Sequence, residues 1–275
     1  MKTIISIVIC FCFLTSGLFC QKSGKVVSLQ SSDKNSTPEL LKQASMVITK
    51  RLNIYGMTSP AVSLIENNQI KVQLPENIDL SEIEGLLTSR GNIGFYETLT
   101  QKEITGTSDS APKSSPSEAR LVCSSSENKH LADSVENFLK SKNLLKGCKL
   151  FWGVKNSKSQ TCLYALKVDG AGNPPIMRKD LETINSSKDN DSQSITLRMK
   201  FKPSSSALWA AITKESMGKP IAIVVGDKVF YTPVVKSSME NGLCEITGNF
   251  TQKEVKYFLA FANNDPLPIS LTLAK

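Results

Sequence analysis

Cysteine is the residue type whose number and spacing offer the clearest chemistry in this chain of 275 residues. Seven cysteines occur, and three of them lie in or beside an apolar run near the N-terminus. The other four are Cys123, Cys148, Cys162 and Cys244. They form no CxxC pair and show no zinc-ligand spacing. In an oxidising compartment four cysteines allow two disulfides in three connectivities, so disulfide formation is the chemistry that this set predicts.

Two of these cysteines flank a predicted strand-turn-strand. Cys148 and Cys162 bracket the segment KLFWGVKNSKSQT, and a hairpin there brings its two ends together. We therefore predict a disulfide between Cys148 and Cys162. The pattern leaves open whether Cys123 and Cys244 pair. Cys244 lies in a predicted strand, where a cysteine is typical of a small buried apolar residue.

Catalytic patterns do not emerge from the other reactive residue types. The single histidine, His130, falls on the polar face of a predicted helix over 129–142, with no nucleophile suggested beside it. The chain has no GxGxxG motif and no P-loop. The carboxylates of Asp79, Glu82 and Glu254 are explained by helix caps. The sequence therefore predicts a protein that is not an enzyme, with no catalytic residue, cofactor or metal site.

Phe151 and Trp152 are adjacent aromatic residues within one predicted strand. Successive side chains of a strand point to opposite faces, so one of the two rings belongs to the core. The other ring either forms an exposed apolar contact surface or is buried as well. Both residues are retained as candidates for contact with a partner.

The N-terminus reads as an export signal over residues 1–20. A basic tip, Met1-Lys2, precedes the apolar run Ile4–Leu14 and then small residues. This run is shorter than the roughly 20 residues of a membrane-spanning helix, although an uncleaved anchor is the alternative. Cys20 is a candidate lipidation site, and the bulky Phe19 before it departs from a lipoprotein signal.

The net charge of +8 arises from 33 basic and 25 acidic residues. Basic proteins can bind nucleic acid or an acidic membrane surface. Here the basic residues are scattered among carboxylates, and an exported protein rarely meets nucleic acid. We therefore expect a soluble charged surface, no nucleic-acid partner, and membrane contact only through a lipid anchor.

The first part of the chain follows the order β-α-β-β-α-β, which is a ferredoxin-like unit. Thr37, Pro38 and Gly56 mark the start and end of its first helix, and Asp79 to Glu82 form a capping box for its second. The predicted strands and helices are 25–29, 37–55, 61–65, 69–74, 79–90 and 93–99.

The last part of the chain repeats strands and helices in a similar order. It includes a hairpin, KPIAIVVGDKVFYTPVV, that turns at Gly226-Asp227, and a second capping box from Thr251 to Glu254. The predicted elements are 195–201, 204–218, 219–235, 244–247, 251–262 and 267–273. Between the two parts, residues 102–120 have a linker composition rich in Ser, Thr, Pro and Lys.

The predicted fold class is α+β with an inserted subdomain. We expect a ferredoxin-like base built from residues 25–101 and 191–275. A head subdomain with flexible linkers is expected over residues 102–190, and the signal peptide over residues 1–20.

Three blocks of the chain resemble the first large periplasmic domain of SecD, an accessory subunit of the Sec translocon. They are ASMVITKRLNIYGMTSPAVSLIENNQIKVQLPENIDLSEIEGLL (44–87), LYALKVDGAGNPPIMRKDLETI (163–184) and the closing half from the hairpin through ENGLCEITGNF to LPISL (218–271). The resemblance implies a ferredoxin-like base that carries a mobile head. It also implies an exported, periplasmic or envelope protein whose partners are exported polypeptides or the Sec machinery.

The departures from the family are as specific as the resemblance. Family members carry a transmembrane helix and a DLxGG-type motif before the base, where this chain has its predicted signal and KVVSLQSSD. Six transmembrane helices with proton-coupling charges normally follow the base, and this chain ends at Lys275. We therefore expect no proton-driven pulling by this chain alone. The function it predicts is binding of unfolded or translocating polypeptide, with Phe151 and Trp152 as candidate contacts; the alternative is docking onto a folded envelope partner.

Overall fold

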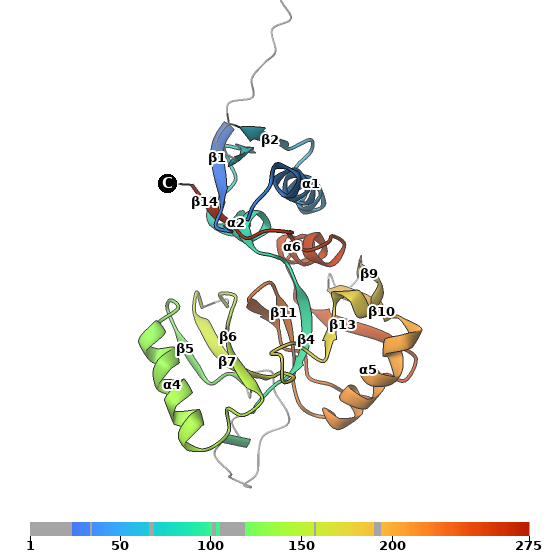
Figure 1. Cartoon of the computed structure of the whole chain (residues 1–275). Helices are drawn as coiled ribbons and strands as arrows, with labels where there is room; N and C mark the ends of the chain where they lie inside the picture. The colour runs from blue at the N-terminus through green and yellow to red at the C-terminus, as the bar shows by residue number, and fades with distance from the viewer. Residues whose placement is uncertain are drawn as a thin grey trace, which may run out of the picture.

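The structure is a computed structural model that describes residues 24–33, 35–65, 69–100, 103–104, 119–156, 158–189 and 194–274. The predicted signal peptide and Cys20 lie outside the described residues. Figure 1 shows two parts, one above the other. We call them the base, residues 24–92 and 249–274, and the head, residues 93–248.

The base contains a four-stranded antiparallel sheet with the order β14-β1-β3-β2. Its strands are β1 (Gly24–Ser31), β2 (Ala61–Ile65), β3 (Gln69–Pro75) and β14 (Leu271–Leu273). This is the strand order of a ferredoxin-like sheet, with β14 in the place of the fourth strand. The predicted α+β class with a ferredoxin-like base is confirmed.

Three helices accompany this sheet: α1 (Pro38–Tyr55), α2 (Leu80–Thr88) and α6 (Gln252–Ala262). The Thr37 hydroxyl accepts the Leu40 N–H at the start of α1, and Gly56 ends α1 with a φ of 111°. Glycine suits this left-handed conformation because it has no Cβ to clash with the backbone. Thr251 and Glu254 form the predicted capping box at the start of α6.

The head has two sheets. The larger one has seven strands in the order β5-β7-β6-β12-β11-β4-β8. They are β4 (Ile93–Glu97), β5 (Val122–Ser124), β6 (Cys148–Gly153), β7 (Thr161–Lys167), β8 (Ile176–Met177), β11 (Ile221–Val225) and β12 (Lys228–Tyr231). Helix α4 (Lys129–Ser141) packs beside it, with Leu139 buried in a small cluster with Leu99 and Ala165.

The smaller head sheet has the order β13-β10-β9. Its strands are β9 (Leu181–Lys188), β10 (Ile195–Phe201) and β13 (Leu243–Gly248). Helix α5 (Pro203–Glu215) follows β10, and a short 3-10 turn, η2 (Arg178–Asp180), precedes β9. The Trp209 ring of α5 stacks on Phe201 at 4.5 Å between centroids, which anchors the helix to this sheet.

The sheets divide the chain differently from the predicted boundaries. Residues 191–248 were assigned to the base, but their strands all pair within the head, and β4 also leaves the base. Only α6 and β14 return to the base. Apolar periodicity marks each strand, but strand partners depend on tertiary packing. The last part of the chain therefore contributes α6 and β14 to the base and its other strands to the head.

The disulfide also differs from the prediction. Cys162 pairs with Cys123, whereas Cys148 and Cys244 are free thiols. The register explains the error, because β5 places Cys123 directly opposite Cys162, while Cys148 lies opposite Lys167 at the far end of the β6–β7 ladder. Cys244 is buried as expected, and burial raises the pKa of its thiol to about 12.

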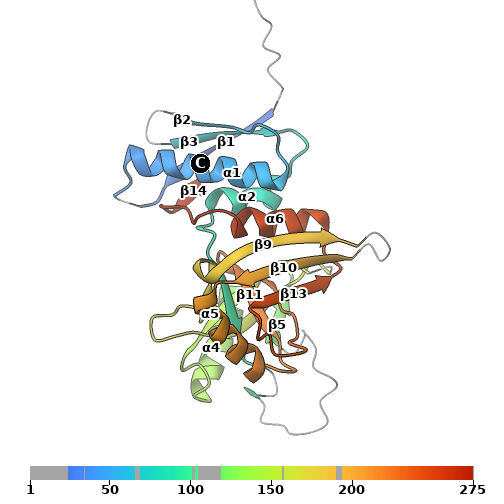
Figure 2. The same cartoon turned by 90° about the vertical axis from the view of Figure 1, so that its right-hand side faces the viewer.

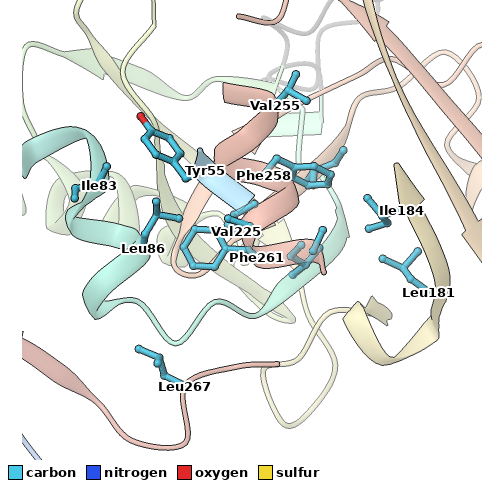
Figure 3. Close-up of a cluster of buried hydrophobic side chains, with 14 of the residues drawn as sticks. Tyr55, Ile83, Leu86, Leu181, Ile184, Val225, Val255, Phe258, Phe261 and Leu267 are labelled. Atoms are coloured by element: carbon cyan, nitrogen blue, oxygen red, sulfur yellow. The ribbon is translucent and has the colours of Figure 1, made fainter. Parts of the chain in front are cut away.

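Helix α6 joins the base and the head through one continuous core. Figure 3 shows Phe258 and Phe261 of α6 between Leu86 on one side and Ile184 of β9 on the other. In Figure 2 the same helix lies between the α1–α2 layer and β9. Phe258 and Phe261 are fully buried. Because the two parts share this core, the packing of α6 sets how the head lies on the base.

A buried arginine closes the end of α2, where the chain leaves the base. Arg51 has no exposed surface, and its guanidinium donates to the carbonyl oxygens of Leu86, Ser89 and Arg90. It also lies over the Phe261 ring, 4.5 Å from the centroid. Burial lowers the pKa of Arg51 to about 10, so the group stays charged at neutral pH. The arginine thus satisfies helix-end carbonyls that would otherwise be buried without donors.

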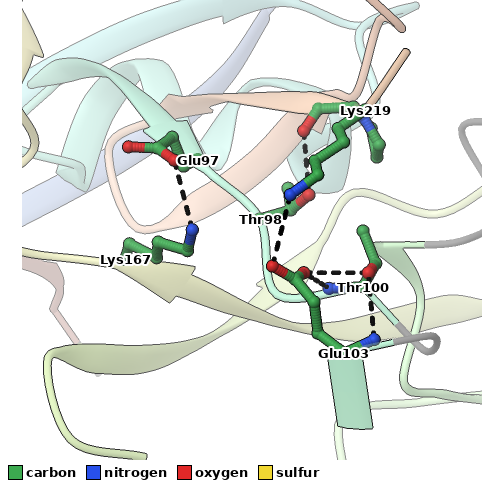
Figure 4. A network of polar contacts seen from close by, with 7 residues as sticks. Glu97, Thr98, Thr100, Glu103, Lys167 and Lys219 are labelled. Carbon is green, nitrogen blue, oxygen red and sulfur yellow. Dashed lines mark hydrogen bonds and ion pairs between the residues drawn. The ribbon is translucent and has the colours of Figure 1, made fainter. Parts of the chain in front are cut away.

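A polar network holds the far end of β4 to its neighbours in the head (Figure 4). Lys167 of β7 contacts the Glu97 carboxylate at 3.2 Å. The Glu103 carboxylate accepts the backbone N–H and the hydroxyl of Thr100, both at 2.8 Å, and lies 3.5 Å from Lys219. Burial would raise the pKa of Glu103, but the Thr100 hydrogen bonds and the nearby lysines outweigh it and lower the pKa.

Candidate functional site

The two aromatic residues singled out in the sequence lie on opposite faces of β6. Phe151 is 9% exposed, and its ring packs on Tyr96 at 5.4 Å between centroids. Trp152 is half-buried on the other face, in register with Leu163 of β7. Neither ring is fully exposed. Their contact with a polypeptide stays a prediction, but β6 leads directly into a groove that the sequence did not reveal.

This groove, which we call the base–head groove, has a volume of about 770 Å³. The first turns of α2 and α6 form its wall on the base side. The end of β6, the residues before α4 and strand β12 form its wall on the head side. Its walls therefore come from both parts of the molecule, so the packing of α6 determines its width.

The floor of the base–head groove is apolar. Val154, directly after β6, is 41% exposed, and its N–H donates to the Val229 carbonyl oxygen at 2.9 Å. Phe230 is half-buried and stacks on Phe258 at 5.3 Å between centroids. Tyr257 completes the floor, and burial raises the pKa of its hydroxyl to about 12, so it is neutral at physiological pH. These rings are held rigidly by the core beneath them.

The charges on the groove walls balance one another. Lys253 contacts Glu82 at 2.8 Å, and Lys228 pairs with Glu127. The charged lining residues are Glu82, Glu127, Glu254, Lys155, Lys228 and Lys253, three of each sign. Exposed ion pairs of this kind contribute only about 0–1 kcal/mol, so an incoming chain can displace them at little cost. The groove combines an apolar floor with a neutral rim.

Sequence reasoning missed this groove because its walls come from distant segments. Val154, Phe230 and Tyr257 belong to three separate elements, and no local pattern links them. One signal was present in the sequence. Val154 is an apolar residue in a polar turn just after a strand, where packing within the hairpin does not explain an apolar side chain. The candidate aromatic residues were thus near the site but not in its lining.

The fold defines a class: a ferredoxin-like base whose chain runs out after α2 into a large head and returns as α6. A sequence model described as SecDF, P1 head subdomain matches residues 164–269, from β7 to just before β14. The matched stretch therefore contains the head from β7 onward and the returning helix α6.

The relatives extend this similarity over nearly the whole chain. The protein translocase subunit SecD of Calditerrivibrio nitroreducens is 24% identical over 264 residues, which cover 93% of this chain and 44% of the relative. The SecDF subunit of Thermus thermophilus is 21% identical over 257 residues, which cover 92% and 30%. The chain spans less than half the length of the curated relatives that it matches.

Solved structures share the fold. A crystal structure of SecDF in its super-membrane-facing form matches 92% of this chain and 30% of that chain, with a TM-score of 0.52 and 18% identity. A structure reported for SecDF as a membrane component that enhances protein export matches 91% of this chain and 98% of that chain, with a TM-score of 0.50 and 17% identity. The predicted resemblance to the first large periplasmic domain of SecD is confirmed.

Within the part of the chain that the structure describes, no helix combines the length and apolar character needed to span a membrane.

Proposed function

We propose that this chain is a non-enzymatic accessory of protein export that binds unfolded or translocating polypeptide in the base–head groove. The observation that carries the proposal is the apolar floor and charge-balanced rim of that groove on a SecD-like fold. We place the protein in the periplasm or envelope, with exported polypeptides and the Sec machinery as its partners. A lipid on Cys20 would be its membrane attachment.

The groove suits a chain without a fixed sequence. Its volume of about 770 Å³ lies within the range of roughly 300–1,000 Å³ typical of ligand pockets, enough for several residues of an extended segment. Its apolar floor can contact apolar side chains of any shape. Its rim carries equal numbers of both charges, so it repels neither acidic nor basic segments. Val154 supplies the most exposed apolar contact, and Trp152 lies two residues before it on β6.

Site-specific photocross-linking in intact envelopes tests this proposal. The cross-linking residue is placed at position 154 or at position 152, and the captured proteins are identified. Leu208 on α5 is the matched control, because it is apolar and 48% exposed but lies outside the groove. We expect many different exported chains at position 154 and few at position 208.

Two results would contradict polypeptide binding. Capture of one folded envelope protein at position 154, with no exported chains, would indicate the alternative of a docking module. Equal capture at positions 154 and 208 would show that the groove has no special role. If position 152 also captures exported chains, Trp152→Ala should reduce the capture at position 154, because a truncated aromatic contact typically costs about 2 kcal/mol.

A further inference from the structure

A second groove lies on the head, across the β11–β12 turn from the first. It has a volume of about 600 Å³, and we call it the basic groove. Its floor is made by Tyr96 of β4, Phe151 of β6 and Val224 of β11, which all belong to one buried cluster. The turn separates the two grooves, because Asp227 lines the basic groove and Lys228 lines the base–head groove.

Four cationic side chains line the basic groove: Lys149, Arg178, Lys179 and Lys202. Two carboxylates, Asp227 and Asp265, also line it, so four positive charges face two negative ones. Among the described residues, none of the four cations is in an ion pair with a carboxylate. By contrast, Lys167, Lys200 and Lys228 of the head strands are each paired with a carboxylate.

Hydrogen bonds of Asp180 hold the backbone that carries three of these cations. The Asp180 carboxylate accepts the Met177 N–H and the Ser205 hydroxyl, both at 2.9 Å. The Asp180 carbonyl oxygen accepts the Lys202 N–H at 2.8 Å. Asp180 therefore fixes the η2 turn, which carries Arg178 and Lys179, against the start of α5, next to Lys202.

The fourth cation is aimed over the aromatic floor. The Lys149 ammonium lies 5.4 Å from the centroid of the Phe151 ring. Arg178 is constrained as well, because it donates to the Leu181 carbonyl oxygen at 3.4 Å, and its Nε is buried without a partner in the structure. The groove thus presents a cluster of positive charges above a recessed apolar surface.

We propose that the basic groove binds an acidic segment of a protein partner, distinct from the polypeptide in the base–head groove. Carboxylates of the segment contact Lys149, Lys179 and Lys202, and an apolar side chain between them reaches the Tyr96–Phe151 floor. The excess of positive charge in the basic groove attracts the acidic segment, because electrostatic complementarity speeds association and favours the matching partner. A flat anionic bilayer does not fit equally well, because it cannot enter a recess to reach that floor.

Binding of a labelled peptide to the full chain tests the proposal. The probe is a dodecapeptide of alternating Glu and Leu, and its control has Gln at every Glu position. We expect the Glu peptide to bind at least about tenfold more tightly at low salt, and the difference to shrink as the ionic strength rises. Equal affinity of the two peptides would overturn the proposal.

Charge-neutralising variants locate the site. The double variant Lys179→Gln, Lys202→Gln should weaken binding of the Glu peptide by about fivefold to tenfold, since each exposed charge pair makes only a modest contribution to affinity. The control is Lys142→Gln, Lys146→Gln, two exposed lysines of the head outside the groove, which should leave the affinity unchanged. Equal effects of both double variants would show only a general charge effect and overturn the site.

A membrane arm separates the remaining alternative. Vesicles of phosphatidylglycerol should retain the parent chain no more strongly than they retain the Lys179→Gln, Lys202→Gln variant. Retention that depends on these lysines, without binding of the Glu peptide, would replace the protein partner by a lipid surface. The cross-linking result at position 154 does not bear on this test, so the two proposals fail independently.

Discussion

The two grooves share the strands of the seven-stranded head sheet, but they differ in rim charge and in what holds their walls. The base–head groove has three charges of each sign, and its walls belong to two parts that pack together through the α6 core. The basic groove has four cations to two carboxylates, and its rim is fixed by Asp180. A neutral, two-part groove suits a varied occupant, whereas a fixed, charged groove suits a selective one.

The largest expected effect comes from removing a side chain on which the base–head groove depends. Phe258 is fully buried in α6 and stacks beneath Phe230 of the base–head groove. Phe258→Ala should lower the free energy of unfolding by about 3–5 kcal/mol, because it leaves a cavity in the shared core. Urea denaturation measures the change, and Leu208→Ala, an exposed position, should stay within about 0.5 kcal/mol of the parent.

This variant also sharpens the comparison between the grooves. Binding at the base–head groove should weaken at protein concentrations where Phe258→Ala remains folded, because the groove loses the support of its floor. Binding of the Glu peptide should change much less, since the rim of the basic groove is held by Asp180. Equal losses at both grooves would show that their walls are not independent.

The second effect concerns the disulfide at the edge of the head sheet. Cys123 and Cys162 join β5 to β7 over a sequence separation of 39. The double variant Cys123→Ser, Cys162→Ser should lose about 2–4 kcal/mol of stability, because the unfolded chain is no longer constrained. Thermal unfolding with and without reductant checks this: reductant should lower the Tm of the parent and leave that of the variant unchanged.

The matched control for the disulfide is the pairing predicted from the sequence. Cys148→Ser should remove no disulfide, since Cys148 is a free thiol opposite Lys167. Intact mass and thiol titration distinguish the two cases. A parent protein that loses its disulfide on Cys148→Ser would contradict the observed register.

A smaller effect separates the grooves directly. Val154→Asp places a charge on the apolar floor of the base–head groove and should weaken binding of an unfolded model peptide by about tenfold, the equivalent of roughly 1.4 kcal/mol. Leu208→Asp introduces the same charge at a similarly exposed position and should leave binding unchanged. Neither variant should alter the affinity for the Glu peptide, which fluorescence anisotropy measures.

The smallest effect is a pH dependence that lies outside both grooves. The pKa of Glu103 is lowered from 4.5 in the folded state, so its contribution to stability is present above that pH and is lost as the pH falls below it. Between about pH 5 and pH 3, the free energy of unfolding should fall less steeply in Glu103→Gln than in the parent. The difference summed over this interval should be less than about 1 kcal/mol. An unchanged slope would show that the Thr100 contacts do not favour the charged carboxylate.

The local features of the fold could be predicted from the sequence because they depend on local chemistry. Thr37 and Gly56 bound α1, the Thr251 capping box starts α6, and the turn at Gly226-Asp227 joins β11 to β12. Each of these signals arises from hydrogen bonds or backbone conformations within a few residues. The succession of these elements predicted the ferredoxin-like order of the base, and the resemblance to SecD implied the same base.

Strand partners and grooves could not be predicted in the same way. The choice of Cys123 over Cys148 as the partner of Cys162 depends on the register of β5 on β7, to which the three-residue strand β5 contributes little sequence signal. The assignment of β10 to the head depends on its pairing with β9 and β13. Both grooves are lined by segments far apart in the chain, so their chemistry exists only after these pairings have formed.

The position of β14 has a consequence for the order in which the molecule assembles. Leu273 pairs with Leu29, and the Ser32 N–H donates to the Ser270 carbonyl oxygen. A chain that emerges from its N-terminus onward can complete every strand of the head before β14 is available. Until then one edge of β1 has no partner, and unpaired edges invite pairing with other chains. The base, although it begins first, is therefore the last part to close, and the newly made protein passes through a stage in which its own sheet is open to an extended strand.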